Sequence, residues 1–286
     1  MRFIATYALT SRTNAIIATA MGAAIPMCFW VAAAVVGLIT LRKGSQEGST
    51  VMLWGSLPAV FWLSQGDPTP ALVIIGVMLM AMVLRSTVSW SQTLVAGAVM
   101  GAITGSTVEW LPPEIMSQLA ELGREMISGS EGLAEQAGIQ LDQFLINTFT
   151  GMISAFHTLV MALSLILARW WQAREFNPGG FQLEFHQLRL SVWSALTLGI
   201  VIVFGAGVTP EALKWIPSLT IPLALACIAL VHGVVTIKQL SKTWLTVFYV
   251  LLFIMGHSLY VFMIFVAFLD SALNFRQRLT TGKTDL

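Results

Sequence analysis

The stretch RWWQAREFNPGGFQLEFHQLRLS, residues 169–191, is a polar, aromatic and basic interruption between two long apolar runs. The run before it covers residues 143–168, and the run after it covers residues 191–208. Trp170 and Trp171 suit a membrane interface, where amphipathic rings settle, and the NPGG sequence predicts a turn. We therefore predict that one helix ends here and that an interfacial helix follows the turn and leads into the next span.

The overall composition is that of an integral membrane protein. Hydrophobic residues make up 56% of the 286 residues and charged residues only 10%, whereas soluble domains carry about 25% charged residues. Apolar runs of about 20 residues match a hydrocarbon core that is about 30 Å thick. The net charge of +1 gives no electrostatic reason to expect nucleic acid as a partner. The sequence thus predicts an all-α membrane helix bundle, a single domain over residues 1–286, in contact with membrane lipid.

The two end regions decide how many membrane segments there are. Residues 13–41 are divided at Pro26, and residues 243–273 have a weak point at Gly256-His257-Ser258. Each end region is either one tilted helix or a hairpin of two short helices, which gives eight or ten segments. The other apolar runs cover residues 49–64, 70–84, 88–108, 143–168, 191–208 and 217–236.

The distribution of basic residues distinguishes these alternatives, because Lys and Arg concentrate in cytoplasmic loops. With ten segments, all Lys and Arg residues except Arg124 and Lys214 fall on one side of the membrane. With eight segments they divide almost evenly. We therefore expect both termini to be cytoplasmic, together with the 169–190 loop and the polar tail at residues 274–286.

Residues 109–142 differ from the rest of the chain because they hold half of its acidic side chains and one basic residue, Arg124. Apolar residues recur here at three- to four-residue spacing, which predicts an amphipathic helix. On the opposite side from the basic loops, this segment would be extracytoplasmic. It would serve either as a solvated cap or as a lid over a pocket. The apolar positions are Ile115, Leu119, Leu122 and Met126.

Small residues repeat at four-residue spacing in two of the apolar runs. Gly97, Gly101 and Gly105 share one helix face, and Ala20 and Ala24 share another. Such faces allow a second helix backbone to approach closely. They predict either packing within the chain or docking of a membrane or cytoplasmic protein partner.

The sequence contains none of the common signatures of catalysis or metal binding. A Walker A loop and the HExxH, CxxC and GxSxG patterns are all absent, so we expect neither an enzyme nor a metal or cofactor site. Ionisable residues at membrane depth are then the candidates for a substrate pocket, because they are costly to place there. The alternative is structural: a histidine bonded to a neighbouring helix, or an ion pair at a helix end. The candidates are Arg85, His157, His232, His257 and Asp270.

Four stretches carry a resemblance that runs nearly end to end. They are RKGSQEG at 42–48, ARWWQAREFNPGGFQLEFHQLRLS at 168–191, LVHGVV at 230–235 and FLDSALNFRQR at 268–278. In these four stretches the chain resembles the YybS-like family of bacterial membrane proteins, which is defined by a domain of unknown function. The resemblance implies the inner, cytoplasmic membrane of a bacterium.

That family is similar to the substrate-binding S-components of energy-coupling-factor vitamin transporters, although this chain has more membrane segments than they typically have. The similarity implies a small molecule bound between helices and a small-residue face that docks on a coupling protein. Ala20 and Ala24 lie in the corresponding region. We therefore expect a transporter-like protein that binds or moves a small solute. The alternative is a membrane scaffold or assembly factor that acts through helix packing and the 169–190 loop.

Overall fold

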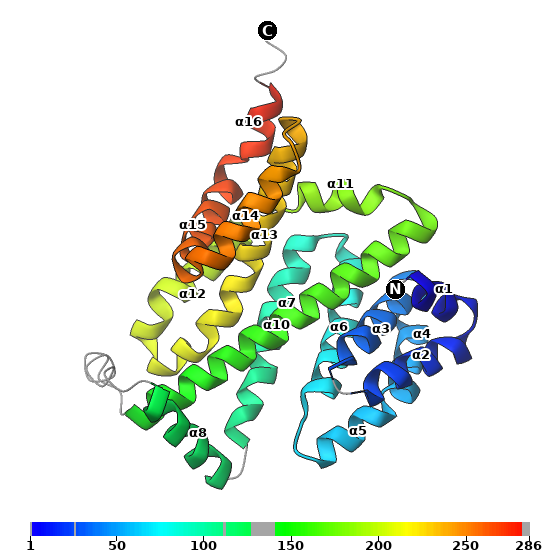
Figure 1. The fold of residues 1–286 in the computed structure, drawn as a ribbon, viewed down its shortest axis with the longest axis vertical. Coiled ribbons are helices and arrows are strands. Elements are labelled where there is room, and N and C mark those ends of the chain that lie inside the picture. The colour runs from blue at the N-terminus through cyan, green and yellow to red at the C-terminus, as the bar shows by residue number, and fades with distance from the viewer. Residues whose placement is uncertain (1, 26, 111–112, 127–140, 282–286) are drawn as a thin grey trace.

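The computed structural model describes residues 2–25, 27–110, 113–126 and 141–281, which form helices joined by short connections, with no β-strand among them (Figure 1). Within these ranges, three helical stretches are each long and apolar enough to cross a membrane, and five qualify if two bent helix pairs each count as one span. The three are Thr69–Thr87, Gln143–Phe176 and Glu211–Ile237. An apolar all-helical fold is therefore confirmed.

The long helix α10 (Leu141–Phe176) is the axis around which the other helices pack, and it crosses the molecule diagonally in Figure 1. It contacts α3 (Phe29–Lys43), α6 (Thr69–Thr87), α7 (Trp90–Gly105) and α13 (Ile216–Ile237). Its 36 residues reach about 54 Å at 1.5 Å per residue. The helix is this long because neither proline nor a flexible turn sequence interrupts it before NPGG.

The predicted helix end, turn and following helix are present at residues 169–191, but Trp171 is buried in the core and does not lie at a surface as the sequence predicts. Helix α10 continues to Phe176, and the turn contains Gly179 with a φ of 87°. This left-handed conformation favours glycine because glycine has no Cβ. The short helix α11 (Gly180–Gln187) follows, and α12 (Val192–Val208) begins after Ser191, whose side chain accepts a hydrogen bond from the Ser194 amide.

Both end regions are broken, as the ten-segment alternative requires. At the N-terminal end, α2 (Arg12–Ala24) and α3 are separate helices that pack against each other. At the C-terminal end, α14 (Thr243–Met255) and α15 (His257–Leu273) lie side by side and meet at Gly256, whose φ is 45°. The other elements are α1 (Arg2–Thr10), α4 (Ser45–Gly55), α5 (Leu57–Ser64), η1 (Ser106–Trp110), α8 (Pro113–Met126), η2 (Pro210–Trp215) and α16 (Phe275–Thr281).

The basic connections gather at the Phe176 end of α10. Thr6 of α1 donates a hydrogen bond to Glu175 at 3.3 Å, and Arg276 of α16 donates to the Leu188 carbonyl at 3.0 Å. At the opposite end, Lys214 and Glu109 form an ion pair of 2.6 Å. The structure therefore places α1 and α16 at the same end of the bundle as the 169–190 loop.

The predicted acidic segment is described only in part. A helix, α8, covers Pro113–Met126, and two of the predicted apolar positions, Ile115 and Leu122, are exposed on it. Gly123 of this helix packs against Leu145 of α10. The remainder of the segment, residues 127–140, lies outside the described residues.

Candidate functional site

His157 is the most deeply buried of the candidate histidines, with 1% of its surface exposed. It lies in α10, and its Nδ1 is 3.0 Å from the Thr104 hydroxyl of α7. Its Nε2 is 3.4 Å from the Thr69 hydroxyl at the start of α6. The ring therefore links three helices through two hydroxyl groups, which is the structural alternative given above for a membrane histidine.

A second polar cluster adjoins His157 on the same helix. Thr158 donates a hydrogen bond to the Ser154 carbonyl at 2.8 Å, and its hydroxyl is also 2.8 Å from that of Ser218 in α13. Ser218 in turn lies 2.6 Å from the Ala98 carbonyl of α7. Since polar groups buried in lipid or protein are costly unless they are bonded, these contacts hold α7, α10 and α13 in a fixed register.

The three histidines do not converge on one pocket. His232 of α13 bonds to the Tyr249 hydroxyl at 2.9 Å, and its ring lies edge-to-face against Phe185 and tilted against His186. His257 is exposed at the first residue of α15. The three candidate histidines therefore lie in three different surroundings in the described part of the chain.

Asp270 forms an ion pair near the end of α15, which is the structural alternative given for it from the sequence. Its carboxylate is 2% exposed, lies 2.6 Å from Nη1 of Arg276 and accepts a hydrogen bond from the Phe275 amide at 2.9 Å. Burial lowers the pKa of the Arg276 guanidinium, and the charge of Asp270 opposes that shift. The ion pair thus attaches α16 to α15 and leaves no free carboxylate oxygen for a substrate.

Arg85 lies at the surface, at the end of α6. Its Nη1 donates a 2.6 Å hydrogen bond to the Leu41 carbonyl in the last turn of α3. No Asp or Glu among the described residues forms an ion pair with it. Arg85 therefore interacts with a helix C-terminus, which carries partial negative charge, and keeps its own full charge uncompensated.

The glycine face of α7 is occupied inside the molecule. A Cβ on Gly97 would meet Met80 at 2.6 Å, one on Gly101 would meet Thr158 at 1.8 Å, and one on Gly105 would meet Ser154 at 1.9 Å. This face packs on α6 and α10, which is the first of the two alternatives given for it from the sequence, packing within the chain. The alanine face of α2 is less enclosed than this glycine face, because Ala20 is only partly buried and Ala24 is exposed.

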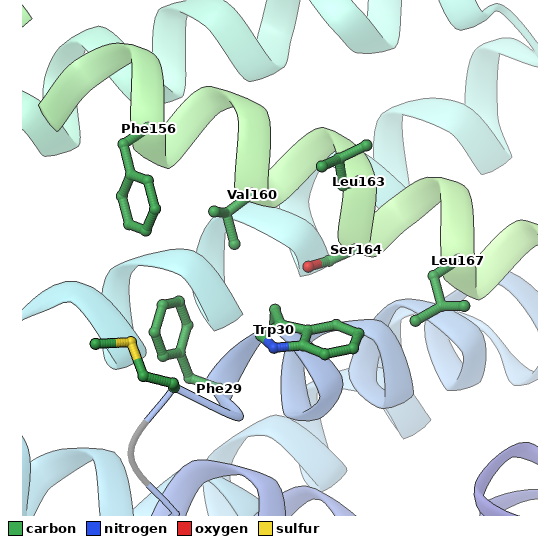
Figure 2. A pocket seen from close by; sticks show the side chains of 8 residues that line it. Phe29, Trp30, Phe156, Val160, Leu163, Ser164 and Leu167 are labelled. Carbon is green, nitrogen blue, oxygen red and sulfur yellow. The ribbon is translucent and has the colours of Figure 1, made fainter. Parts of the chain in front are cut away.

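A groove between α3 and α10 was not predicted from the sequence. It has a volume of about 460 Å³ and is lined almost entirely by apolar side chains (Figure 2). Figure 2 shows the Ser164 hydroxyl directed into the space between Val160 and the Trp30 ring. Ser164 is 1% exposed, and its oxygen has no hydrogen-bond partner in the part of the chain that the structure describes. The oxygen is buried beneath the wall of the groove, so a ligand that accepts or donates one hydrogen bond would satisfy it once a lining side chain shifts aside.

The connection between α2 and α3 adjoins this groove. Met27 lines it and has a φ of 62°, a left-handed conformation that is uncommon for a residue with a side chain. Such strained residues cluster at binding sites. Pro26 signals this break in the sequence, and Ser164 follows His157 by two helical turns. The sequence does not show that these two regions meet.

No group of three or more His, Cys, Asp or Glu side chains suited to a metal ion occurs among the described residues. The chain matches no family model, and neither a curated protein nor a solved structure is significantly similar to it. The class that the fold supports is an apolar helical protein with helices able to cross a membrane.

Proposed function

We propose that this chain is a multi-pass protein of the bacterial inner membrane that binds a small, mainly apolar molecule in the α3–α10 groove. In this proposal it is a YybS-like protein and acts as an S-component-like, transporter-type subunit. The observation that carries the proposal is the buried, unpartnered hydroxyl of Ser164 inside an otherwise apolar groove.

Large exposed apolar side chains support a membrane environment. Phe253 and Ile254 of α14 are 91% and 72% exposed, and Val203 and Phe204 of α12 are 68% and 64% exposed. Soluble proteins rarely expose such contiguous apolar surface, whereas lipid tails solvate it. The proposal counts ten helical units as membrane segments: α2, α3, the α4–α5 pair, α6, α7, α10, α12, α13, α14 and α15.

The short length of α2 supports a binding site within the membrane. Its 13 residues reach about 20 Å, which is less than the hydrocarbon thickness of about 30 Å. The α2–α3 connection would then lie below the membrane surface. Non-helical backbone is tolerated at that depth where it is covered by protein or lines a cavity, and transporters use such broken helices at their substrate sites.

The shape and lining of the groove indicate the class of ligand. Its volume of about 460 Å³ lies in the range of about 300–1,000 Å³ that is usual for small-molecule sites. Trp30, Phe29 and Phe156 supply aromatic surface, and Ser164 supplies one polar contact. We expect an apolar or amphipathic molecule with one carbonyl or hydroxyl group, entering from the lipid.

Thermal unfolding of the purified chain with a panel of apolar metabolites tests this function. A ligand should raise the unfolding temperature, and Ser164→Ala should weaken its binding by roughly fivefold, the worth of one hydrogen bond of about 1 kcal/mol. Val160→Trp should abolish the shift by filling the groove. The matched control is Val203→Trp on the exposed surface of α12, which should leave the shift unchanged. If no member of the panel binds, or if Val160→Trp binds normally, this function is wrong.

One observation favours a scaffold as the second candidate. Helix α11 has no buried residue, and Leu183 on it is 66% exposed. A partner at the 169–190 loop would cover this side chain. Leu183→Ser should then reduce co-purification of a stoichiometric membrane partner without changing the unfolding temperature. Unchanged co-purification would count against the scaffold.

A further inference from the structure

A second cavity lies at the Phe176 end of the bundle, where α11 folds back over the ends of α3, α6 and α7 (Figure 1). It has a volume of about 310 Å³ and differs from the groove described above because several polar side chains line it. Arg85, Trp90, Arg169, Gln172 and Glu184 contribute these groups, while leucine and valine side chains supply the apolar remainder.

The two arginines of this cavity differ in their partners: within the described part of the chain, only Arg169 is paired with a carboxylate. Arg169 donates from Nε to Glu184 at 3.0 Å, makes a second bond to the same carboxylate, and donates from Nη1 to Gln172 at 3.2 Å. Its charge is therefore neutralised by a two-pronged ion pair, which also fixes α11 on α10. Arg85 has the Leu41 carbonyl as its hydrogen-bond acceptor and no carboxylate partner among the described residues. The cavity consequently carries one net positive charge.

Trp90 adds a second group that lacks a partner. Its indole nitrogen is buried and makes no hydrogen bond within the described part of the chain. An indole N–H can only donate, so the group that would satisfy it is an acceptor. Trp90 is also the first residue of α7, and the positive end of that helix dipole adjoins the cavity. Positive charge, an unused N–H donor and the helix dipole all favour an anion.

The apolar part of the lining distinguishes a lipid from a free ion. Leu84 and Val88 line the cavity beside Arg85, and Val88 is 85% exposed. A free phosphate would gain nothing from these side chains, whereas a phospholipid could place its phosphate at Arg85 and its acyl chains along the apolar surface. Basic pockets between membrane helices at the cytoplasmic side are suited to anionic headgroups.

We propose that this cavity binds the phosphodiester headgroup of an anionic membrane phospholipid, with Arg85 and the Trp90 indole as the donors. The proposal does not depend on the ligand of the α3–α10 groove. It predicts that the full chain binds phosphatidylglycerol in preference to phosphatidylcholine with the same acyl chains, as measured by native mass spectrometry in detergent.

Three substitutions make the test specific. Arg85→Gln should weaken phosphatidylglycerol binding by roughly tenfold, and Trp90→Phe, which keeps the ring that packs near Phe181, by roughly threefold to tenfold. The matched control is Arg278→Gln, because Arg278 is also exposed and donates to a helix-end carbonyl, that of Leu273, at 2.9 Å. It should leave binding unchanged.

The outcomes separate the sources of the phosphate group. Preference for phosphatidylglycerol that both cavity variants reduce, and that excess inorganic phosphate does not displace, supports the proposal. Equal binding of the two lipids, or equal effects of Arg85→Gln and Arg278→Gln, overturns it. Displacement by millimolar inorganic phosphate also overturns it, because the site would then recognise the free ion. Trp90→Phe keeps the test valid if Arg85→Gln fails to fold.

Discussion

His157 and His257 are the same side chain in opposite surroundings, and their substitutions should differ accordingly. His157 is buried between two threonine hydroxyls, whereas His257 is exposed at the start of α15. We expect His157→Leu to lower the free energy of unfolding by about 1–3 kcal/mol, since Thr104 and Thr69 lose a bonded partner. His257→Leu should change it by no more than about 0.5 kcal/mol. Denaturant-induced unfolding in detergent measures both, and equal effects would contradict the assigned environments.

At the residue scale, the sequence identifies the unusual side chains but does not show what surrounds them. The helix-end ion pair at Asp270 could be predicted because Arg276 follows within six positions on the same chain segment. The separation of His157, His232 and His257 could not, because helical periodicity does not determine which helix faces meet. Ser164 carries no signal of its own, since a single hydroxyl on an apolar helix usually bonds to its own backbone.

Helix α7 is held in place through close contact of its glycines, so adding a methyl group there should destabilise the protein. A Cβ on Gly101 would lie 1.8 Å from the Thr158 hydroxyl and 2.8 Å from the Ser154 carbonyl. We expect Gly101→Ala to cost about 1–3 kcal/mol of stability. Gly207→Ala in α12 is the control, because nothing lies within 4 Å of its Cβ position. If Gly101→Ala were as stable as this control, the close packing of α7 on α10 would be wrong.

The ion pair that joins α15 to α16 should behave as a coupled unit. Removing either side chain breaks a buried charge pair, so Asp270→Leu and Arg276→Met should each cost about 3–5 kcal/mol. The double substitution should cost clearly less than the sum of the two. A double-mutant cycle of unfolding free energies provides the measurement, and additive costs would show that the 2.6 Å contact contributes no coupling.

At the element scale, the sequence predicts breaks better than packing. Pro26 and the Gly256-His257-Ser258 weak point both mark connections between separate helices, and NPGG marks the turn before α11. The α3–α10 groove arises between lining residues that are more than 100 positions apart in the sequence, such as Trp30 and Phe156. Its lining follows from how α10 crosses α3, which depends on side-chain packing and not on either helix alone.

The orientation of the whole molecule can be tested with isosteric cysteine substitutions. In a chain whose two cysteines, Cys28 and Cys227, are replaced by alanine, Ser64→Cys and Ser241→Cys place exposed thiols at opposite ends of the bundle. We expect a membrane-impermeant maleimide to label Ser64→Cys in intact spheroplasts. Ser241→Cys should react only after the membrane is permeabilised. The reverse pattern would contradict cytoplasmic placement of the basic end.

The most direct test of the proposed function is to identify the compounds that remain bound to the protein after extraction from membranes. Native mass spectrometry of the wild-type chain, followed by release and identification of bound molecules, should show one apolar or amphipathic compound other than a bulk phospholipid. The Val203→Trp control should retain that compound and Val160→Trp should lose it, because only the second substitution fills the groove beside Ser164. Equal retention in both variants, or no bound compound in any of the three proteins, would contradict a small-molecule site between α3 and α10.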